Sequence, residues 1–206
     1  MQAVLVSHNR KKIAELRDIL TRVCPDLILL SAGEAGLPDD IPEDGDTFEE
    51  NALIKARAAA RLGYIGIADD SGLTVDALDG APGVYSARYA GEHGDDAANN
   101  AKLLRELAAR PDAPRTAAFV CAMACVFPDG ESFTCLGRCS GEILTEARGE
   151  GGFGYDPLFF YAPLDKTFAQ LSGEEKNRVS HRARALEAFA PRFADRAEKY
   201  LKKTTK

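Results

Sequence analysis

The sequence predicts an α/β fold built on a mixed sheet. Apolar segments typical of strands alternate with segments of helical periodicity along the first part of the chain. Two apolar strands separated by Pro-Asp-Gly then predict a hairpin, which adds antiparallel pairing to the sheet. Helices close the chain, so the expected architecture is a mixed central sheet flanked by helices.

The N-terminal segment predicts a strand, a helix and a second strand. Residues 2–6 (QAVLV) and 27–31 (LILLS) are short apolar runs and are interpreted as strands. Residues 10–23 carry apolar side chains three and four positions apart, which is the period of a helix. The loop at 7–9 (SHN) therefore leads from a strand into a helix N-terminus.

A capping box predicts where the next helix begins. Thr47 and Glu50 have the spacing at which each side chain bonds to the backbone N–H of the other. The helix is expected to end at about Leu62, because Gly63 follows it. A buried strand is expected over 64–68 (YIGIA), and it leads into two consecutive aspartates.

The middle of the chain supplies the hairpin. A helix is expected over 96–110, and Pro111 is expected to end it. Two strands are expected over 116–127 and 131–139, and a further short strand over 142–146. These strands make the sheet mixed rather than wholly parallel.

A second capping box opens the C-terminal helical region. Ser172 and Glu175 have the same spacing as the first box, and helix is expected from there to about Tyr200. Pro191 is expected to interrupt this region, since proline lacks the N–H that a helix interior uses. Ser180 is a candidate cap for a fresh helix inside it.

Composition restricts the partners and the compartment. The 206 residues fit a single domain over 1–206, with a solvated tail from about residue 201. The net charge of −6 disfavours non-specific binding to nucleic acid or an anionic membrane. No secretory signal and no membrane-spanning apolar run is recognised. The five cysteines suit a reducing compartment, so a cytoplasmic protein is predicted.

Two matches to known motifs do not fit their context. The stretch 149–154 (GEGGFG) has the glycine spacing of a dinucleotide-binding loop, but Pro157 follows and no strand-to-helix turn surrounds it. The C-x3-C pairs at 121/125 and 135/139 suggest zinc, yet extended strands separate such residues by about 13 Å. Core cysteines are therefore favoured over a zinc site.

The loop after the first strand has two open interpretations. Ser7 and Asn9 are good N-cap residues, and Lys12 stands one turn into the expected helix. Free backbone N–H groups and the helix dipole would attract a phosphate there. An ordinary capped helix with solvated lysines has the same sequence pattern.

Carboxylates gather in two places. The loop and helix start at 43–50 contain five acidic side chains, which either solvate the helix and favour its dipole or supply a ligand for a cation. Asp69 and Asp70 follow the predicted strand, and neighbouring strand residues point to opposite faces. Mg²⁺ needs only one or two carboxylates besides phosphate oxygens and water, so one from each place suffices.

Two further candidate groups for ligand binding can also be explained by structure alone. The segment 153–156 (FGYD) suits a flat aromatic ligand, or it is a glycine-rich loop with two core aromatics. Lys176, His181 and Arg182 lie within seven residues, and a generic charged helix face would explain them equally well.

Together these segments resemble the inosine triphosphate pyrophosphatase family, the non-canonical purine nucleoside triphosphate pyrophosphatases. The resemblance runs nearly end to end through SHNRKKIAEL, EDGDTFEENALIKA, IADDSGLTVDALDGAPGVYSARYAG, GGFGYDPLF and EEKNRVSHRARAL. One departure is that the first loop often reads Thr-Gly-Asn in this family and here reads Ser-His-Asn. The hydroxyl and the amide are both kept.

The resemblance implies a function and a site. The family hydrolyses ITP, dITP and XTP to the monophosphate and pyrophosphate with Mg²⁺, and its fold is a twisted sheet in an elongated, two-lobed homodimer with the site in a cleft. By motif, Glu43 and Asp70 would bind the metal, and Asp70 would be the general base. The implied substrate-binding residues are Ser7, His8, Asn9, Lys12, Ser71, Phe153, Gly154, Tyr155, Asp156, Lys176, His181 and Arg182.

Base polarity agrees with this substrate class. Hypoxanthine and xanthine carry an acceptor at C6 where adenine has a donor, so a donor such as Arg182 would favour them. One rival is a pyrophosphatase of pyrimidine or modified nucleotides, which the segments SHR and FGYD disfavour. Another is a non-catalytic nucleotide-binding module, which the paired aspartates disfavour because mere binding needs no base.

Overall fold

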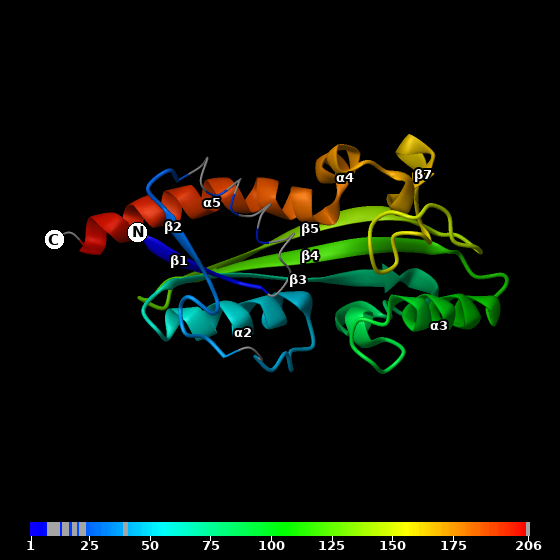
Figure 1. Ribbon diagram of the computed structural model, residues 1–206, viewed down its shortest axis with the longest axis horizontal. Helices are drawn as coiled ribbons and strands as arrows, with labels where there is room; N and C mark the ends of the chain where they lie inside the picture. The colour runs from blue at the N-terminus through cyan, green and yellow to red at the C-terminus, as the bar shows by residue number, and fades with distance from the viewer. Residues whose placement is uncertain (8–12, 14–16, 18–19, 21–23, 39–40, 205–206) are drawn as a thin grey trace. The chain divides into compact units, whose positions relative to one another are not determined.

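The fold is a twisted seven-stranded sheet flanked by helices, as predicted (Figure 1). The computed structural model describes the chain except for residues 8–12, 14–16, 18–19, 21–23, 39–40 and 205–206. The strand order is β2-β1-β3-β4-β5-β6-β7. The strands are β1 (Gln2–Val6), β2 (Ile28–Ser31), β3 (Ile65–Val75), β4 (Thr116–Val126), β5 (Ser132–Ile143), β6 (Phe159–Tyr161) and β7 (Lys166–Thr167).

The sheet is mixed. Strand β1 pairs in parallel with both β2 and β3, with Ala3 opposite Leu29 and Ile65. Strands β5, β6 and β7 pair antiparallel. The predicted mixed pairing is therefore confirmed, and β1, flanked on both sides, is buried over Ala3–Val6.

Two of the described helices begin where the capping boxes predict. Thr47 caps α2 and Ser172 caps α4, each in a reciprocal bond pair with a glutamate three residues on. The α-helices are α2 (Phe48–Ala60), α3 (Asp96–Ala108), α4 (Gly173–Val179) and α5 (His181–Thr204). Short 3₁₀ turns cover Asp76–Leu78, Gly83–Arg88, Ala162–Leu164 and Phe168–Gln170.

The chain divides into two compact units. Unit 1 comprises Met1–Asp70, Ala122–Gly137 and Arg184–Lys206, and unit 2 comprises Ser71–Cys121 and Arg138–Ala183. Strands β3, β4 and β5 therefore contribute residues to both units. Across the described part of the chain, no helix is long and apolar enough to cross a membrane.

In unit 1, α2 covers one face of the sheet and α5 the other (Figure 1). The packing of α2 against β3 is close, because a Cβ at Gly66 would clash with the carbonyl oxygen of Ala56. On the α5 side, Phe189 lies with its ring centroid 5.2 Å from that of Phe133 in β5 and 5.8 Å from that of Phe193. Aromatic packing thus fixes α5 on its face.

Unit 2 has an aromatic core of its own. The ring of Phe119 lies 4.6 Å from Phe159 and 5.5 Å from Phe168, measured between centroids. Helix α3 completes this core with Leu103 and Leu107, both nearly inaccessible to solvent. These packed rings bury a large apolar surface, which stabilises the fold of unit 2.

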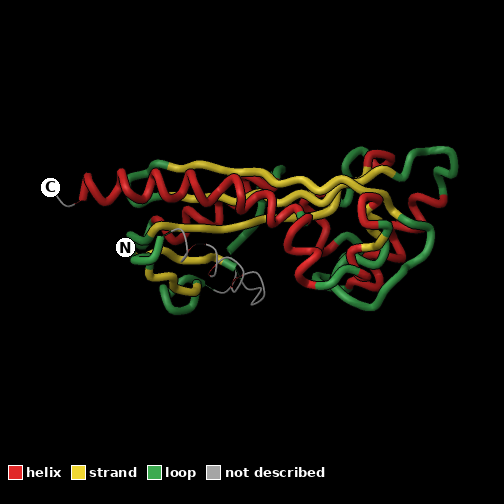
Figure 2. The backbone as a smooth tube through the Cα atoms, turned by 90° about the horizontal axis from the view of Figure 1, so that it is seen from above, coloured by secondary structure: helices red, strands yellow, loops and turns green. Residues whose placement is uncertain are grey.

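Three sequence predictions about the elements are wrong. Strand β3 runs on through the aspartates to Val75, because Leu73 and Val75 continue the buried alternation. The separate strand expected at 142–146 does not form, since its first residues are the end of β5. Pro191 does not interrupt the helix, and Figure 2 shows α5 unbroken.

The intact helix at Pro191 has a packing explanation. Proline removes one i to i−4 hydrogen bond and costs about 3 kcal/mol in a helix interior. Phe189 and Phe193 flank it and are fully buried. Burial of such side chains contributes about 1.5–3 kcal/mol each, which offsets the cost.

Candidate active site

Strand β3 separates the two consecutive aspartates. Alternation along the strand puts Gly66 and Asp70 on the face that α2 covers and Asp69 on the other face. Asp69 is 3% exposed, whereas Asp70 keeps partial access to solvent. Asp70 is therefore the aspartate that shares a face with the residues of α2.

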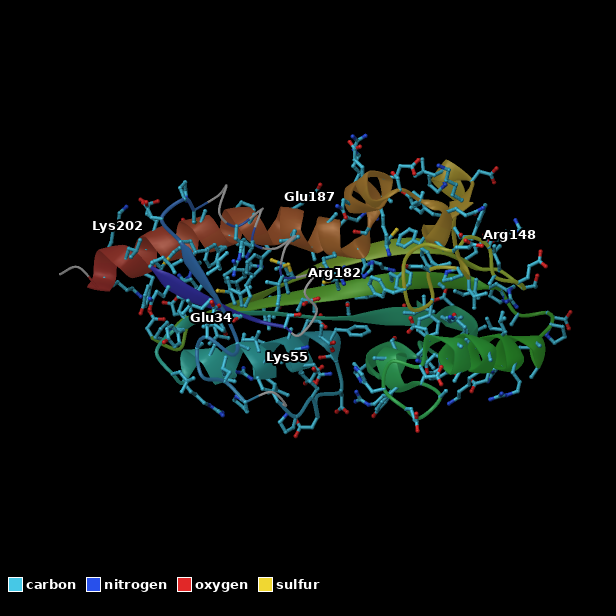
Figure 3. The ribbon with its side chains drawn as sticks, in the orientation of Figure 1. Glu34, Lys55, Arg148, Arg182, Glu187 and Lys202 are labelled. Carbon is cyan, nitrogen blue, oxygen red and sulfur yellow. The ribbon has the colours of Figure 1, made fainter. Side chains whose placement is uncertain are left out.

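Lys55 lies between two carboxylates. It extends from α2 (Figure 3), and its Nζ lies 3.1 Å from Oε1 of Glu43 and 3.8 Å from Oδ1 of Asp70. Only 14% of the Lys55 side chain is exposed, so solvent screens this cluster less than it screens a surface pair. Lys55 therefore connects Glu43 of the acidic loop with Asp70 of β3.

Asn51 connects the same two segments by hydrogen bonds. Its Oδ1 accepts from the backbone N–H of Gly45 at 2.9 Å, and its Nδ2 donates to Oδ2 of Asp70 at 3.2 Å. Asn51 is 1% exposed, so a lost partner would leave a buried polar group unsatisfied. Asn51 and Lys55 are four residues apart and share one face of α2.

The carboxylates fit a hard cation that arrives with a substrate. Glu43 and Asp70 both approach one ammonium, so the two carboxylates lie on either side of Lys55 in the same unit. Among the described residues, no three His, Cys, Asp or Glu side chains form a metal-binding group. Two carboxylates with the remaining ligands from phosphate and water is the arrangement that Mg²⁺ uses in nucleotide sites.

Ser7 follows β1 beside the aspartates. The register pairs Val6 with Ala68, so the chain leaves β1 next to Asp69 and Asp70 in the sheet. Ser71 comes directly after Asp70 within β3. His8, Asn9 and Lys12 lie outside the described residues.

In unit 2, Asp156 organises the segment 153–156. Its Oδ2 accepts from the backbone N–H of Phe153 at 2.9 Å and is paired with Nζ of Lys176. Asp156 is 2% exposed, and such a buried carboxylate requires partners of this kind. The same ammonium lies 4.7 Å from the ring centroid of Phe153.

Phe153 and Tyr155 have different surroundings. Phe153 is 48% exposed, and an aromatic ring open to solvent is a surface on which a planar ligand can stack. Tyr155 is buried in the core and donates its hydroxyl to the carbonyl of Ser86 at 2.9 Å. Burial raises the pKa of Tyr155, which keeps the phenol a neutral donor.

His181 and Arg182 begin α5. His181 is 6% exposed and stacks on Phe119, with ring centroids 4.9 Å apart. Arg182 is 8% exposed, and an arginine so deeply buried is rare. Ser180 caps the helix by accepting from the N–H of Ala183 at 3.2 Å, as the sequence predicted.

The structure thus brings together two groups of predicted residues, one in each unit. Glu43 and Asp70 both approach Lys55 in unit 1, and Asp156 of the segment 153–156 pairs with Lys176 in unit 2. Sequence reasoning missed Asn51 and Lys55. Their signal was a polar pair at i, i+4 on the helix that directly follows the acidic loop.

Comparison with known proteins identifies the family. The model of the Ham1 family matches residues 3–192. The dITP/XTP pyrophosphatase of Desulfotalea psychrophila is 51% identical over 202 residues, covering 96% of this chain and 89% of that protein.

Solved structures agree with the sequence matches. A HAM1 protein from Coxiella burnetii matches with a TM-score of 0.89 at 42% identity, covering 95% of this chain and 99% of that chain. A nucleoside-triphosphatase / dITP/XTP pyrophosphatase from Mycobacterium abscessus matches with a TM-score of 0.80 at 48% identity, covering 93% and 100%. The resemblance found in the sequence is confirmed, and the chain belongs to the Ham1 family.

Proposed function

We propose that this protein hydrolyses ITP, dITP and XTP at the α–β phosphoanhydride, giving the monophosphate and pyrophosphate. This reaction removes deaminated purines from the nucleotide pool. The observation that carries the proposal is the cluster of Glu43 and Asp70 around Lys55, supported by Asn51. The names of the relatives from D. psychrophila and M. abscessus point to the same reaction.

In this proposal Glu43 and Asp70 hold Mg²⁺. When bound, Mg²⁺ offsets the negative charge of the phosphates and makes an attacking water more acidic. Asp70 accepts the proton of that water, which requires the carboxylate to lie within hydrogen-bond reach. Asn51 holds Oδ2 of Asp70 in place, and Lys55 lies beside Oδ1 and can bind a phosphate oxygen.

The triphosphate is assigned to the segment that follows β1. We assign its binding to Ser7, His8, Asn9 and Lys12. Ser71 lies next to the proposed general base, Asp70. A protein of net charge −6 can hold a strongly anionic ligand only through such local donors and a metal. The position of Ser7 beside the aspartates in the sheet supports this assignment.

The purine base is assigned to residues of unit 2. The exposed ring of Phe153 offers a stacking surface, and Arg182, His181 and Lys176 offer donors beside the segment 153–156. A donor facing C6 would pair with an oxo group and leave adenine unsatisfied. Tyr155 would act from the core by supporting the segment.

The proposal includes the assembly implied by the family resemblance. The single domain of 1–206 would comprise two lobes, and two copies would form a homodimer. The proposed compartment is the cytoplasm. Light scattering of the purified protein tests the dimer, because a monomer mass would contradict it.

A substrate panel tests the proposed function. Pyrophosphate release is measured for ITP, dITP, XTP, GTP, ATP and TTP with Mg²⁺ present. The three deaminated purines should exceed ATP by at least about a hundredfold in kcat/KM, as expected where buried polar groups select a substrate. Preference for TTP would favour the pyrimidine rival, and binding of ITP without turnover would favour the non-catalytic module.

A further inference from the structure

Helix α3 holds both peptide groups that flank Gly154. The backbone N–H of Gly154 donates to Oδ2 of Asp96 at 2.6 Å, and its carbonyl accepts from Nδ2 of Asn100 at 2.9 Å. These residues are far apart in sequence but lie in the same unit. The contact therefore ties the segment 153–156 to the helix at two points of one residue.

The two holding side chains are themselves oriented. Asp96 and Asn100 are four residues apart, so they share a face of α3. Nδ2 of Asn100 also donates to the backbone carbonyl of Asp96 at 2.9 Å, which fixes the direction of the amide. Leu103 and Leu107 anchor the same helix in the core of unit 2.

The conformation at Gly154 needs such support. Its φ is +60°, a left-handed conformation that glycine adopts easily but that is one of several open to it. A glycine loses more backbone freedom on ordering than any other residue. Fixing both its N–H and its carbonyl selects one conformation from this set.

The orientation of Phe153 depends on that conformation. The backbone N–H of Phe153 donates a hydrogen bond to Asp156, and Gly154 is the next residue in the chain. A rotation about the backbone of Gly154 would move the exposed ring relative to Asp156 and Lys176. The hydrogen bonds from Asp96 and Asn100 to Gly154 therefore act on the position of the Phe153 ring.

We infer that Asp96 and Asn100 are positioning residues for recognition of the purine base, because they fix Gly154 and through it the ring of Phe153. This inference rests on the proposed function, in which the segment 153–156 binds the base. Neither side chain needs to touch the substrate. Their loss should weaken substrate binding and base selection more than it slows the chemical step at Asp70.

A neighbouring aspartate gives a matched control. Asp95 caps α3, and its carboxylate accepts from the N–H of Ala98 at 2.9 Å rather than from Gly154. Asp95→Ala and Asp96→Ala remove the same charge from the same turn, so both weaken the helix start. Only Asp96→Ala and Asn100→Leu remove a bond to Gly154.

The test compares these variants in the full-length protein with Mg²⁺ present. Asp96→Ala and Asn100→Leu should each raise KM for ITP about three- to tenfold, the equivalent of one hydrogen bond, and change kcat less than about twofold. The ratio of kcat/KM for ITP to that for ATP should fall. Asp96→Asn keeps an acceptor for the N–H and should restore KM, and Asp95→Ala should leave KM unchanged.

Hydrogen exchange gives a readout that does not need turnover. Asp96→Ala should speed exchange of amides in the segment 149–156, whereas Asp95→Ala should not. Equal KM values for Asp96→Ala and Asp95→Ala, in a protein that hydrolyses ITP, would overturn the inference. A wild-type protein that fails to hydrolyse ITP, or a Phe153→Ala variant with unchanged KM, would instead overturn the assignment on which the inference rests.

Discussion

Asp69 and Asp70 are adjacent in sequence but differ in environment. Strand alternation gives Asp70 a place on the α2 face, where Asn51 donates to it and Lys55 lies beside it. Asp69 lies on the opposite face and is almost fully buried. A carboxylate with partial solvent access and oriented neighbours is the better proton acceptor for a water.

Replacement of Asp70 by asparagine tests this difference. Asp70→Asn should lower kcat for ITP by about a hundred- to ten-thousandfold, the usual contribution of a general base. The circular dichroism spectrum and the Tm should change little, because asparagine has nearly the same shape. Full activity in Asp70→Asn, together with its loss in Asp69→Asn, would assign the base to Asp69 instead.

The role of Asn51 can be separated from that of Asp70. Asn51→Leu leaves the N–H of Gly45 without its acceptor and should lower the free energy of unfolding by about 1–3 kcal/mol. It should also raise the Mg²⁺ concentration needed for half-maximal hydrolysis of ITP, because Asp70 and the loop that carries Glu43 both lose a bond to Asn51. An unchanged free energy of unfolding in Asn51→Leu would contradict this role.

The candidate site was predictable from sequence only where a long motif carried it. Asp70 and Glu43 stand in recognisable segments, so the family resemblance alone selects them. Lys55 and Asn51 stand in the same segment as Glu43, but the polar pair that they form at i, i+4 does not by itself reveal their contacts. Their contacts join positions that the sequence separates, and only the packing of α2 against β3 brings them together.

Among the elements, a single glycine sets the distance between α2 and β3. Gly66 lies on the same face of β3 as Asp70, and a Cβ there would clash with the carbonyl oxygen of Ala56. No side chain fits without moving the helix. The close approach is what lets the short side chain of Asn51 reach Asp70.

Gly66→Ala should therefore affect both stability and activity. Overpacking typically costs about 1–3 kcal/mol, and displacement of α2 should also separate Asn51 and Lys55 from Asp70. Chemical denaturation and ITP turnover measure the two effects. Gly33→Ala is the control, since no atom lies within 4 Å of a Cβ built there and the variant should match the wild type.

The capping box of α4 predicts a pH dependence. Glu175 accepts from Lys166 and from the backbone N–H of Ser172, and these bonds, with that of Lys166 the larger cause, lower its pKa below the ordinary 4.5. The folded state therefore favours the carboxylate. The stabilisation is present above the ordinary pKa and disappears as the pH falls through the lowered one.

Glu175→Gln should lower the Tm at about pH 7 and have progressively less effect as the pH falls below the ordinary pKa of the carboxyl group. Glu174→Gln is the matched control, because Glu174 pairs with the exposed Arg178 one turn along the same helix. A Tm difference between wild type and Glu175→Gln that stays constant with pH would contradict the proposed bonds. So would an equal loss in Glu174→Gln.

Local signals predicted where elements begin better than where they end. Capping residues bond within their own turn, so Thr47 and Ser172 marked both helix starts correctly. The extension of β3 to Val75 and the continuous α5 at Pro191 depend on packing against distant segments. Tertiary contacts of this kind override local propensity and cannot be read from a window of sequence.

For the protein as a whole, net charge and substrate charge oppose each other. A protein of net charge −6 repels a nucleoside triphosphate at long range, so binding requires local cations and a metal. Lys55 and Lys176 are the described lysines that lie against carboxylates of the candidate site. Their pairing keeps one positive charge in place in unit 1 and one in unit 2.

The proposed reaction is attack of water that releases pyrophosphate from a deaminated purine triphosphate. Phosphorus NMR of the purified protein with ITP and Mg²⁺ identifies the products directly. We expect IMP and pyrophosphate in equal amounts, with no inorganic phosphate and no IDP during the reaction. Formation of IDP and inorganic phosphate would contradict the proposed function, because the bond broken would then be the β–γ rather than the α–β phosphoanhydride.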